Sequence, residues 1–217
     1  MSNPATITVE ATATAAAPPD IARIRLFTFA EDPAPGDALT SCSLLTERVL
    51  AALRAAGVAP ADLETTSIDL NEHQRRDGES TVHGYRASAS LSARVRPPQE
   101  AGRIVAAAVD AAGTGVGINN VSFDIDDRAP LVSLARREAV GLAVGAAKEL
   151  AEAANLVLGA LVELVEGQRE RPRFGLGHFK AAARMAQTVA APPVELGELS
   201  VAVTVSAVFE VAPAASS

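Results

Sequence analysis

The chain has 217 residues, of which 48% are hydrophobic and only 3% aromatic, and its net charge is −7. This length suits one large domain or two small ones, with a core built from small side chains. The acidic balance argues against a general nucleic-acid binder, which needs a basic face. The single cysteine, Cys42, excludes an internal disulfide and a multi-cysteine metal site.

The first residues of the sequence carry no recognisable export signal. Met1-Ser2-Asn3-Pro4 has neither a positively charged region nor an apolar run. The chain also contains no apolar stretch of about 18 residues, the length that a membrane-spanning helix needs. We therefore expect a cytoplasmic protein without a transmembrane segment.

Two strands open the predicted fold. Residues 6–14 alternate apolar and polar side chains, the period-two pattern of a half-buried strand. Pro18-Pro19-Asp20 interrupts this pattern, and residues 21–30 form a second strand whose Arg23 and Arg25 lie opposite the aliphatic face. The short polar break predicts that the two strands pair with each other in antiparallel fashion.

A helix follows, which begins at Asp32-Pro33-Ala34-Pro35 and ends at Gly57, a residue typical of helix C-termini. Its predicted apolar stripe comprises Leu39, Cys42, Leu45, Val49 and Leu53. Because Cys42 lies on this stripe and has no predicted basic neighbour that would activate its thiol, we interpret it as a buried hydrophobic residue.

A β-hairpin and a second helix come next. The strands at 62–75 and 81–96 are joined through Arg76-Asp77-Gly78-Glu79-Ser80, and Asp-Gly is a strong short-range hairpin signal. Pro97-Pro98 ends the second strand, and residues 99–112 have the spacing of an amphipathic helix.

Residues 116–166 organise the rest of the chain as a strand at 116–126, a long helix at about 130–154 and a strand at 156–166. Steps of three and four residues between apolar positions predict that one helical face lies on a sheet. The positions of that face are Leu131, Ala135, Ala139, Leu142, Ala146, Leu150 and Ala153.

The last third of the chain contains a long basic loop at 167–193 and a final strand at 195–211. The regular alternation of the final strand predicts a position within a sheet, with Val203 buried. The segments 1–5 and 213–217 are interpreted as tails. The whole pattern predicts an α+β fold: about seven strands in a mostly antiparallel sheet, with three helices packed on one side in ββα-type repeats. We expect a single domain over residues 6–212.

Several motifs, in this order, resemble the SIMPL domain family, which includes periplasmic immunogenic proteins of bacteria and has long been described as a domain of unknown function. The motifs are Pro19-Asp20-Ile21-Ala22, Leu53 with Gly57, Asp62 and Thr65, Gly84-Tyr85-Arg86-Ala87-Ser88, Gly117-Ile118-Asn119-Asn120-Val121-Ser122-Phe123, Ala135-Arg136 with Ala139, Ala143, Lys148 and Leu150-Ala151, Leu158-Gly159, and Glu195-Leu196-Gly197-Glu198. The resemblance covers roughly residues 5–212.

This sequence departs from the family pattern in three ways. Ala11 and Ala13 replace glycines that are usual in the first strand. Asn155 stands where the long helix usually ends in glycine, although asparagine also tolerates the left-handed conformation. The export signal usual in bacterial members is missing from the first residues.

The resemblance implies an α+β fold with no established catalytic residues and no cofactor. It also implies relatives in the bacterial envelope with a link to stress resistance, some of which form large oligomers, and an animal relative that is a signalling adaptor associated with a kinase.

The three histidines are the first candidates for a site. With a three-residue hairpin loop at 77–79, His73 and His83 lie opposite each other and close enough to share a metal ion. A loop of two or four residues separates them. The more ordinary interpretation is a pair of solvated strand histidines, and His178 lies far away in the basic loop.

Two further clusters have structural explanations. Gly113-Thr114-Gly115-Val116-Gly117 follows a helix and precedes a strand, the opposite order to a phosphate loop, so we interpret it as a helix end and turn. Asp124, Asp126 and Asp127 are candidates for metal or acid–base chemistry, but their place before a helix favours capping of that helix. Arg136 is expected on a solvated helix face, with an anion-binding or interface role as the alternative.

The basic loop is the strongest functional candidate that the sequence offers. Its basic and aromatic side chains suit an acidic partner or an anionic surface, and the alternative is a solvated loop. These residues are Arg169, Arg171, Arg173, Phe174, Phe179, Lys180 and Arg184.

The leading functional hypothesis is a non-enzymatic protein that self-assembles or binds a protein partner, since no catalytic or nucleotide-binding motif is found and no cofactor is implied. The alternative is a small-ligand or metal-binding module, or an enzyme, that uses the hairpin histidines and the basic loop. A cavity that gathers two or more of His73, His83, Asp126, Arg136 and His178 would favour the alternative.

Overall fold

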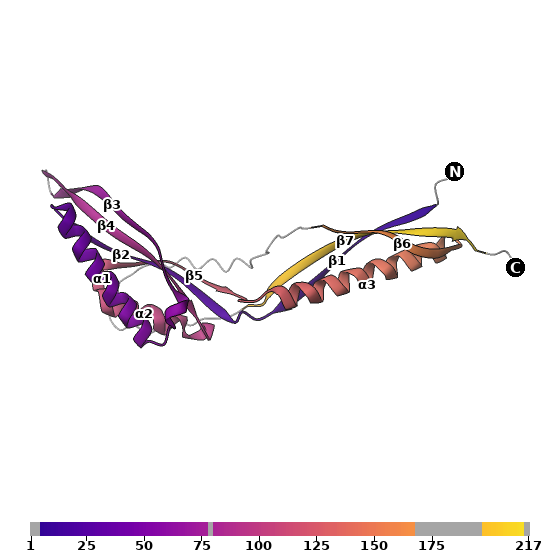
Figure 1. The fold of residues 1–217 in the computed structure, drawn as a ribbon, viewed down its shortest axis with the longest axis horizontal. Helices are drawn as coiled ribbons and strands as arrows, with labels where there is room; N and C mark the ends of the chain where they lie inside the picture. Colours follow the sequence, from indigo (N-terminus) through magenta and orange to yellow (C-terminus); the bar gives the residue numbers. More distant parts are fainter. Residues whose placement is uncertain (1–4, 78–79, 168–196, 215–217) are drawn as a thin grey trace. The chain divides into compact units, whose positions relative to one another are not determined.

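The computed structural model describes residues 5–77, 80–167 and 197–214, which form seven strands and three α-helices (Figure 1). The α+β prediction is confirmed. The strands lie in two antiparallel sheets, one with the order β1-β7-β6 and the other with the order β3-β4-β2-β5. Each sheet belongs to its own compact unit of the chain. None of the described helices is long and apolar enough to cross a membrane.

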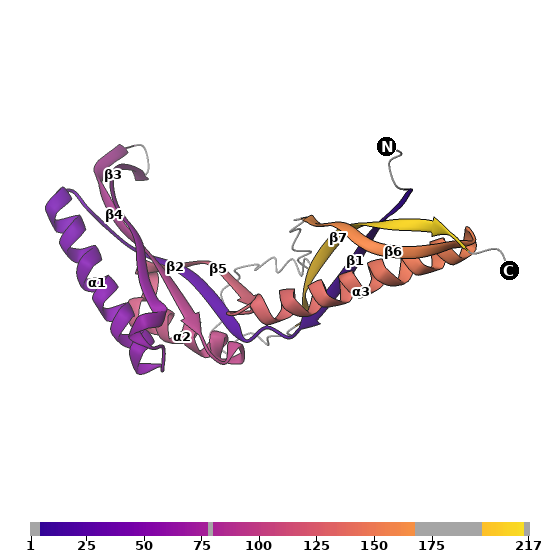
Figure 2. The same cartoon turned by 45° about the vertical axis from the view of Figure 1, so that its right-hand side comes forward.

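The first unit consists of β1 (Thr6–Ala17), α3 (Ala129–Ala153), β6 (Leu156–Gly167) and β7 (Leu199–Pro213). β7 lies between the other two strands, as its regular alternation predicted, and Val203 is buried. Helix α3 runs along one face of this sheet, and alternate residues of β1 and β7 form the core beneath it (Figure 2).

The predicted face of α3 is only partly correct. The buried residues repeat every four positions and are all alanines: Ala135, Ala139, Ala143, Ala147 and Ala151. Leu142 and Leu150, which were expected inward, are about half exposed. Small side chains let the helix backbone approach the sheet closely, so the alanine row forms the contact and the leucines are displaced to its flank.

The second unit consists of β2 (Ile21–Asp32), α1 (Pro35–Ala55), β3 (Leu63–Asp77), β4 (Ser80–Val95), α2 (Ala101–Ala112) and β5 (Val116–Asp124). This order is the β-α-β-β-α-β arrangement, in which two helices cover one face of a four-stranded sheet. Both views show α1 and α2 on the same side of the sheet (Figures 1 and 2). Their apolar faces enclose Ile24 and Leu26 of β2 and Leu91 of β4.

The predicted pairing of β1 with β2 is wrong. β1 pairs with β7 along its whole length, and β2 pairs with β4 and β5. The alternating pattern of a strand is satisfied by any neighbour, and Pro18-Pro19-Asp20 marks the passage from one unit to the other and not a hairpin turn.

The ends of the helices follow the residues expected there. Gly57 after α1 adopts a φ of +95°, a conformation that glycine reaches without a steric penalty. Asn155 after α3 adopts a φ of 56°, which confirms that asparagine takes the left-handed position. On the stripe of α1, Cys42 is buried as predicted, while Leu39 is partly exposed.

Candidate functional site

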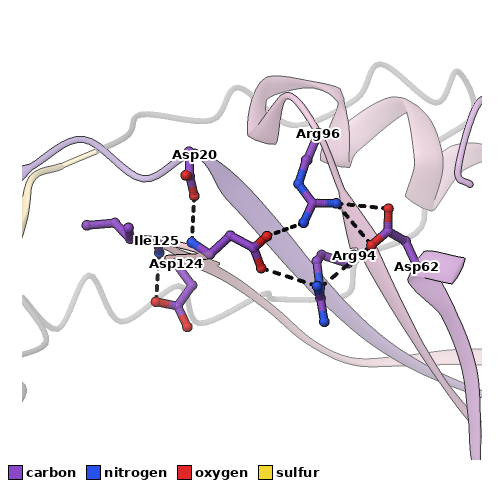
Figure 3. A network of polar contacts seen from close by, with 7 residues as sticks. Asp20, Asp62, Arg94, Arg96, Asp124 and Ile125 are labelled. Carbon is purple, nitrogen blue, oxygen red and sulfur yellow. Dashed lines mark hydrogen bonds and ion pairs between the residues drawn. The ribbon is translucent and has the colours of Figure 1, made fainter. Parts of the chain in front are cut away.

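Two arginines and two aspartates form a polar network in the second unit (Figure 3). Arg96, just after β4, donates from Nη1 to both carboxylate oxygens of Asp62, at 3.0 and 2.9 Å. Its Nη2 donates to Asp126. Arg94 contributes a bond of 3.2 Å from Nη1 to Asp126 Oδ1. Arg94 Nε also lies 3.8 Å from Asp62 Oδ1, so both arginines connect Asp62, in the 3₁₀ turn before β3, with Asp126, just after β5.

Backbone contacts extend the network to the start of β2. The amide of Asp126 donates to Asp20 Oδ1 at 2.8 Å, and the amide of Asp20 donates to the carbonyl of Asp124 at 3.1 Å. Asp20 and Asp62, which both belong to motifs of the sequence resemblance, thus have structural partners. The cluster closes one end of the four-stranded sheet.

The electrostatics of this cluster favour the charged forms of Asp126 and Arg96. The hydrogen bond from Arg96 holds the pKa of Asp126 below its ordinary value of 3.8. The same bond, with the one to Asp62, raises the pKa of Arg96. Groups that stay ionised and are paired with each other are poor general acids or bases at neutral pH. Asp126 and Arg96 are therefore poorly suited to proton transfer. A hollow of about 190 Å³, which Glu100 and Arg103 also line, adjoins Arg96 and Asp62.

The predicted cap role is confirmed for Asp127, whereas Asp126 contacts the arginines instead. Its Oδ1 accepts the amide of Ala129, the first residue of α3, at 2.9 Å. Asp124 Oδ1 accepts the amide of the next residue, Ile125, at 2.8 Å. The carboxylate of Asp126 accepts hydrogen bonds from Arg94 and Arg96, because the end of β5 lies near the end of β4.

The hairpin histidines do not lie opposite each other. The loop has two residues, 78 and 79, so that His73 pairs with Gly84 and Gln74 pairs with His83. His73 Nε2 lies 3.3 Å from Glu31 Oε1. Both histidines nevertheless line one hollow of about 160 Å³ beside Asp32 and Tyr85. The cavity that would favour a ligand-binding or enzymatic role thus exists for this pair.

Arg136 is committed to a partner within its own unit. Its Nε and Nη2 contact the two carboxylate oxygens of Glu166 at 2.6 and 3.0 Å, which ties α3 to β6. This bidentate contact lowers the pKa of Glu166 below its ordinary value of 4.5 and raises the pKa of Arg136. Arg136 lies on an exposed face of α3, as expected, and also forms an ion pair there.

The remaining candidates do not add to these sites. The basic loop residues Arg169, Arg171, Arg173, Phe174, Phe179, Lys180 and Arg184, together with His178, lie outside the described residues. Gly113 follows α2 with a φ of +57°, in agreement with a helix end and turn. Within the part of the chain that the structure describes, no group of three or more His, Cys, Asp or Glu side chains is placed to hold a metal ion.

Sequence reasoning missed two features. The Arg94–Arg96–Asp62–Asp126 network joins residues 30 to 34 positions apart, and the only signal was that each residue stands at an element end. The second is the edge of β6, where Val157, Leu161, Val162, Leu164 and Val165 are between 46% and 57% exposed. The sequence of 156–166 contains this signal, because apolar residues stand on both faces of that strand.

Comparison with known proteins gives a consistent result. A family model described as SIMPL, protein of unknown function (DUF541), matches residues 7–209. The 26 kDa periplasmic immunogenic protein of Brucella abortus (strain S19) is 31% identical over 221 residues, which cover 96% of this chain and 85% of that protein. The protein of the same name from Brucella melitensis biotype 1 is 30% identical over the same shares.

The expected cytoplasmic location is contradicted by these relatives, since both are named as periplasmic proteins and point to export. The prediction rested on the absence of a charged and an apolar region in the first residues. That absence does not decide where the protein acts.

Proposed function

Because the chain belongs to the SIMPL family, we propose that it is a non-enzymatic, exported protein that assembles with copies of itself through the open edge of its three-stranded sheet. The names of the relatives support the location outside the cytoplasm. The exposed apolar edge of β6 is the observation that carries the proposed assembly. A role in stress resistance stays a prediction from the resemblance.

β6 has the properties of an interface strand. Among the strands that the structure describes, it pairs with β7 alone, so the backbone groups along its other edge face outward. It is twelve residues long, and its charged residues are Glu163 and Glu166, the latter held by Arg136. Natural edge strands are usually short or guarded by lysine or proline, because an open apolar edge recruits another strand.

A second β6 is the occupant that matches this edge best. The other edge of the same sheet, β1, exposes threonines, and its apolar residues point into the core. A threonine-rich edge offers less apolar area to β6 than another β6 does. Pairing of like edges produces a twofold, closed contact. We therefore expect a dimer as the basic unit of assembly.

Size-exclusion chromatography with light scattering tests the proposal. The expected mass is a multiple of twice the chain mass of 22.2 kDa. The variant Val162→Lys/Val165→Lys places two charges on the β6 edge and should shift the protein to the monomer. The matched control is Thr8→Lys/Thr14→Lys, which places the same charges on exposed positions of β1.

The results that contradict the proposal are specific. A monomeric wild type at all accessible concentrations would mean that β6 is covered by another part of the chain or by a different protein. Dissociation by the β1 variant, with no effect of the β6 variant, would place the contact on the opposite edge. Circular dichroism must show that both variants keep their secondary structure.

A further inference from the structure

The face of the four-stranded sheet opposite α1 and α2 carries a polar hollow of about 460 Å³. This volume lies in the range of small-molecule sites. β2 crosses the hollow with Arg23 and Arg25, and β4 crosses it with Ser90 and Ser92. The alternation of β2 explains the placement, since Ile24 and Leu26 are buried under the helices and the arginines point to the other side.

Arg25 is the available cation of this hollow. Its side chain is exposed, and within the described residues it has neither a hydrogen bond nor an ion pair. Arg23 is half-buried and interacts electrostatically with Asp126. A guanidinium without a partner presents two parallel N–H groups, which fit the oxygens of a carboxylate or a phosphate.

Hydroxyl groups lie directly beside Arg25. The register places Ser92 opposite Arg25, and Ser90 lies two residues further along β4, opposite Phe27. Both serines are half-buried, and neither side chain makes a hydrogen bond to another described residue. Each hydroxyl can donate one hydrogen bond and accept others. Thr66, in contrast, already donates to the carbonyl of Ser90 at 3.3 Å.

Glu64 marks the opposite side of the hollow. It pairs with Ser92 across β3 and β4, so Arg25, Ser92 and Glu64 form one row over three strands. Strand spacing sets the length of this row at roughly 10 Å. The row therefore offers a cation at one end, a hydroxyl in the middle and a hydrogen-bond acceptor at the other end. A ligand that matches it carries an oxyanion and, a few ångströms away, hydroxyl groups.

We propose that this hollow binds a small hydroxylated anion, either a sugar acid or a sugar phosphate. Its oxyanion lies on Arg25, and its hydroxyl groups donate to Glu64 and exchange hydrogen bonds with Ser92. The carboxylate of Glu64 repels a second anionic group at that end, so a ligand with two charged ends is disfavoured. A neutral sugar lacks the charge-assisted contact with Arg25. The site is separate from the β6 edge and does not depend on assembly.

Isothermal titration with four probes tests the proposal: glucuronate, glucose 6-phosphate, glucose and succinate. We expect at least one of the two hydroxylated anions to bind, with glucose and succinate weaker by about tenfold or more, the effect of one charge-assisted hydrogen bond. The preferred member of the first pair identifies the ligand as a carboxylate or a phosphate. Failure of both hydroxylated anions to bind at millimolar concentration, or equal binding of succinate, overturns the proposal.

Substitutions locate the binding. Arg25→Gln should weaken it by about tenfold or more, and Arg25→Lys should weaken it less, because the charge remains and the paired geometry is lost. Arg48→Gln is the matched control, since Arg48 is an exposed arginine on α1, across the sheet. An effect of Arg48→Gln equal to that of Arg25→Gln overturns the assignment. Amide shifts in labelled protein must map to Arg25 and Ser92, and shifts confined to other strands also overturn it.

Discussion

The hydroxyl groups of Thr28 and Thr46 share a hydrogen bond of 2.6 Å inside the apolar contact between β2 and α1. Thr28 is fully buried, and Thr46 also donates within α1 to the carbonyl of Cys42 at 2.8 Å. Each hydroxyl thus satisfies the other in a place where water is absent.

The first prediction follows from this pair. Thr28→Val should lower the free energy of unfolding by about 1–3 kcal/mol, because it leaves the hydroxyl of Thr46 with fewer partners in the core. The double variant Thr28→Val/Thr46→Val should lose less than the sum of the two single losses, since it removes both polar groups. Urea unfolding of the four proteins measures this coupling, and strictly additive losses would show that the two hydroxyl groups are independent.

The second prediction concerns the central strand of the first unit. Val203 is 5% exposed and faces the alanine row of α3. Val203→Asp should lower the free energy of unfolding by several kcal/mol (about 3 or more), because it buries an unpaired charge. The control Ala202→Asp changes the neighbouring exposed position. A melting temperature of Val203→Asp within a degree or two of wild type would contradict the burial of this residue.

The third prediction concerns acid. The contacts of Glu166 with Arg136 and of Asp126 with Arg96 lower the pKa of each carboxyl below its ordinary value, 4.5 for glutamate and 3.8 for aspartate. The folded state therefore binds fewer protons than the unfolded state as these groups titrate, and its stability falls as the pH drops through and below these values. The slope of stability against pH below about pH 4.5 should be smaller in Glu166→Gln. An unchanged slope in that variant would mean that the pair contributes nothing.

The fourth prediction compares two glycines. Gly57→Ala should lower stability by about 1 kcal/mol, because a side chain is strained at a φ of +95°. Gly141→Ala should raise stability by up to about 1 kcal/mol, because Gly141 lies within α3 and a Cβ there meets nothing within 4 Å. Thermal unfolding measures both, and changes of the same sign would contradict the assigned backbone conformations.

The fifth prediction addresses the expected single domain at 6–212. The first unit is assembled from three separate stretches of the chain, and residues 19–126 of the second unit are inserted between β1 and α3. The first unit cannot form until its distant strands meet, so we expect one cooperative calorimetric transition. Two resolved transitions would show that the units unfold separately and would contradict a single domain.

Local patterns predicted the elements but not all of their partners. Asp77-Gly78 correctly marked the β3–β4 hairpin, yet one residue in loop length decided whether His73 faces His83. The alternation of apolar and polar residues along 199–211 correctly predicted a strand, β7, in the middle of its sheet. The pairing of β1 with β7 joins residues nearly 200 positions apart, and no local signal distinguishes it from a hairpin with β2.

The candidate sites were predictable to a smaller degree for a similar reason. Arg23 and Arg25 were placed on a face opposite the aliphatic residues, but the hollow also needs Ser92 and Glu64 from two other strands. The exposed position of Arg136 was predicted, but its ion pair was not, because its partner Glu166 lies 30 residues away on β6. Side-chain pairing across elements depends on register, and periodicity within one element carries no information about it.

The alanine row of α3 does not by itself fix the position of the helix along its axis. The row presents five identical methyl groups to the sheet, one on each turn: Ala135, Ala139, Ala143, Ala147 and Ala151. A shift by four residues, about 6 Å along the axis, would put alanine on alanine again. The larger residues of α3 that flank the row, among them Leu131, Val140 and Val144, therefore help to set the axial position of the helix. The bidentate contact between Arg136 and Glu166 adds to this, because it forms at only one axial position.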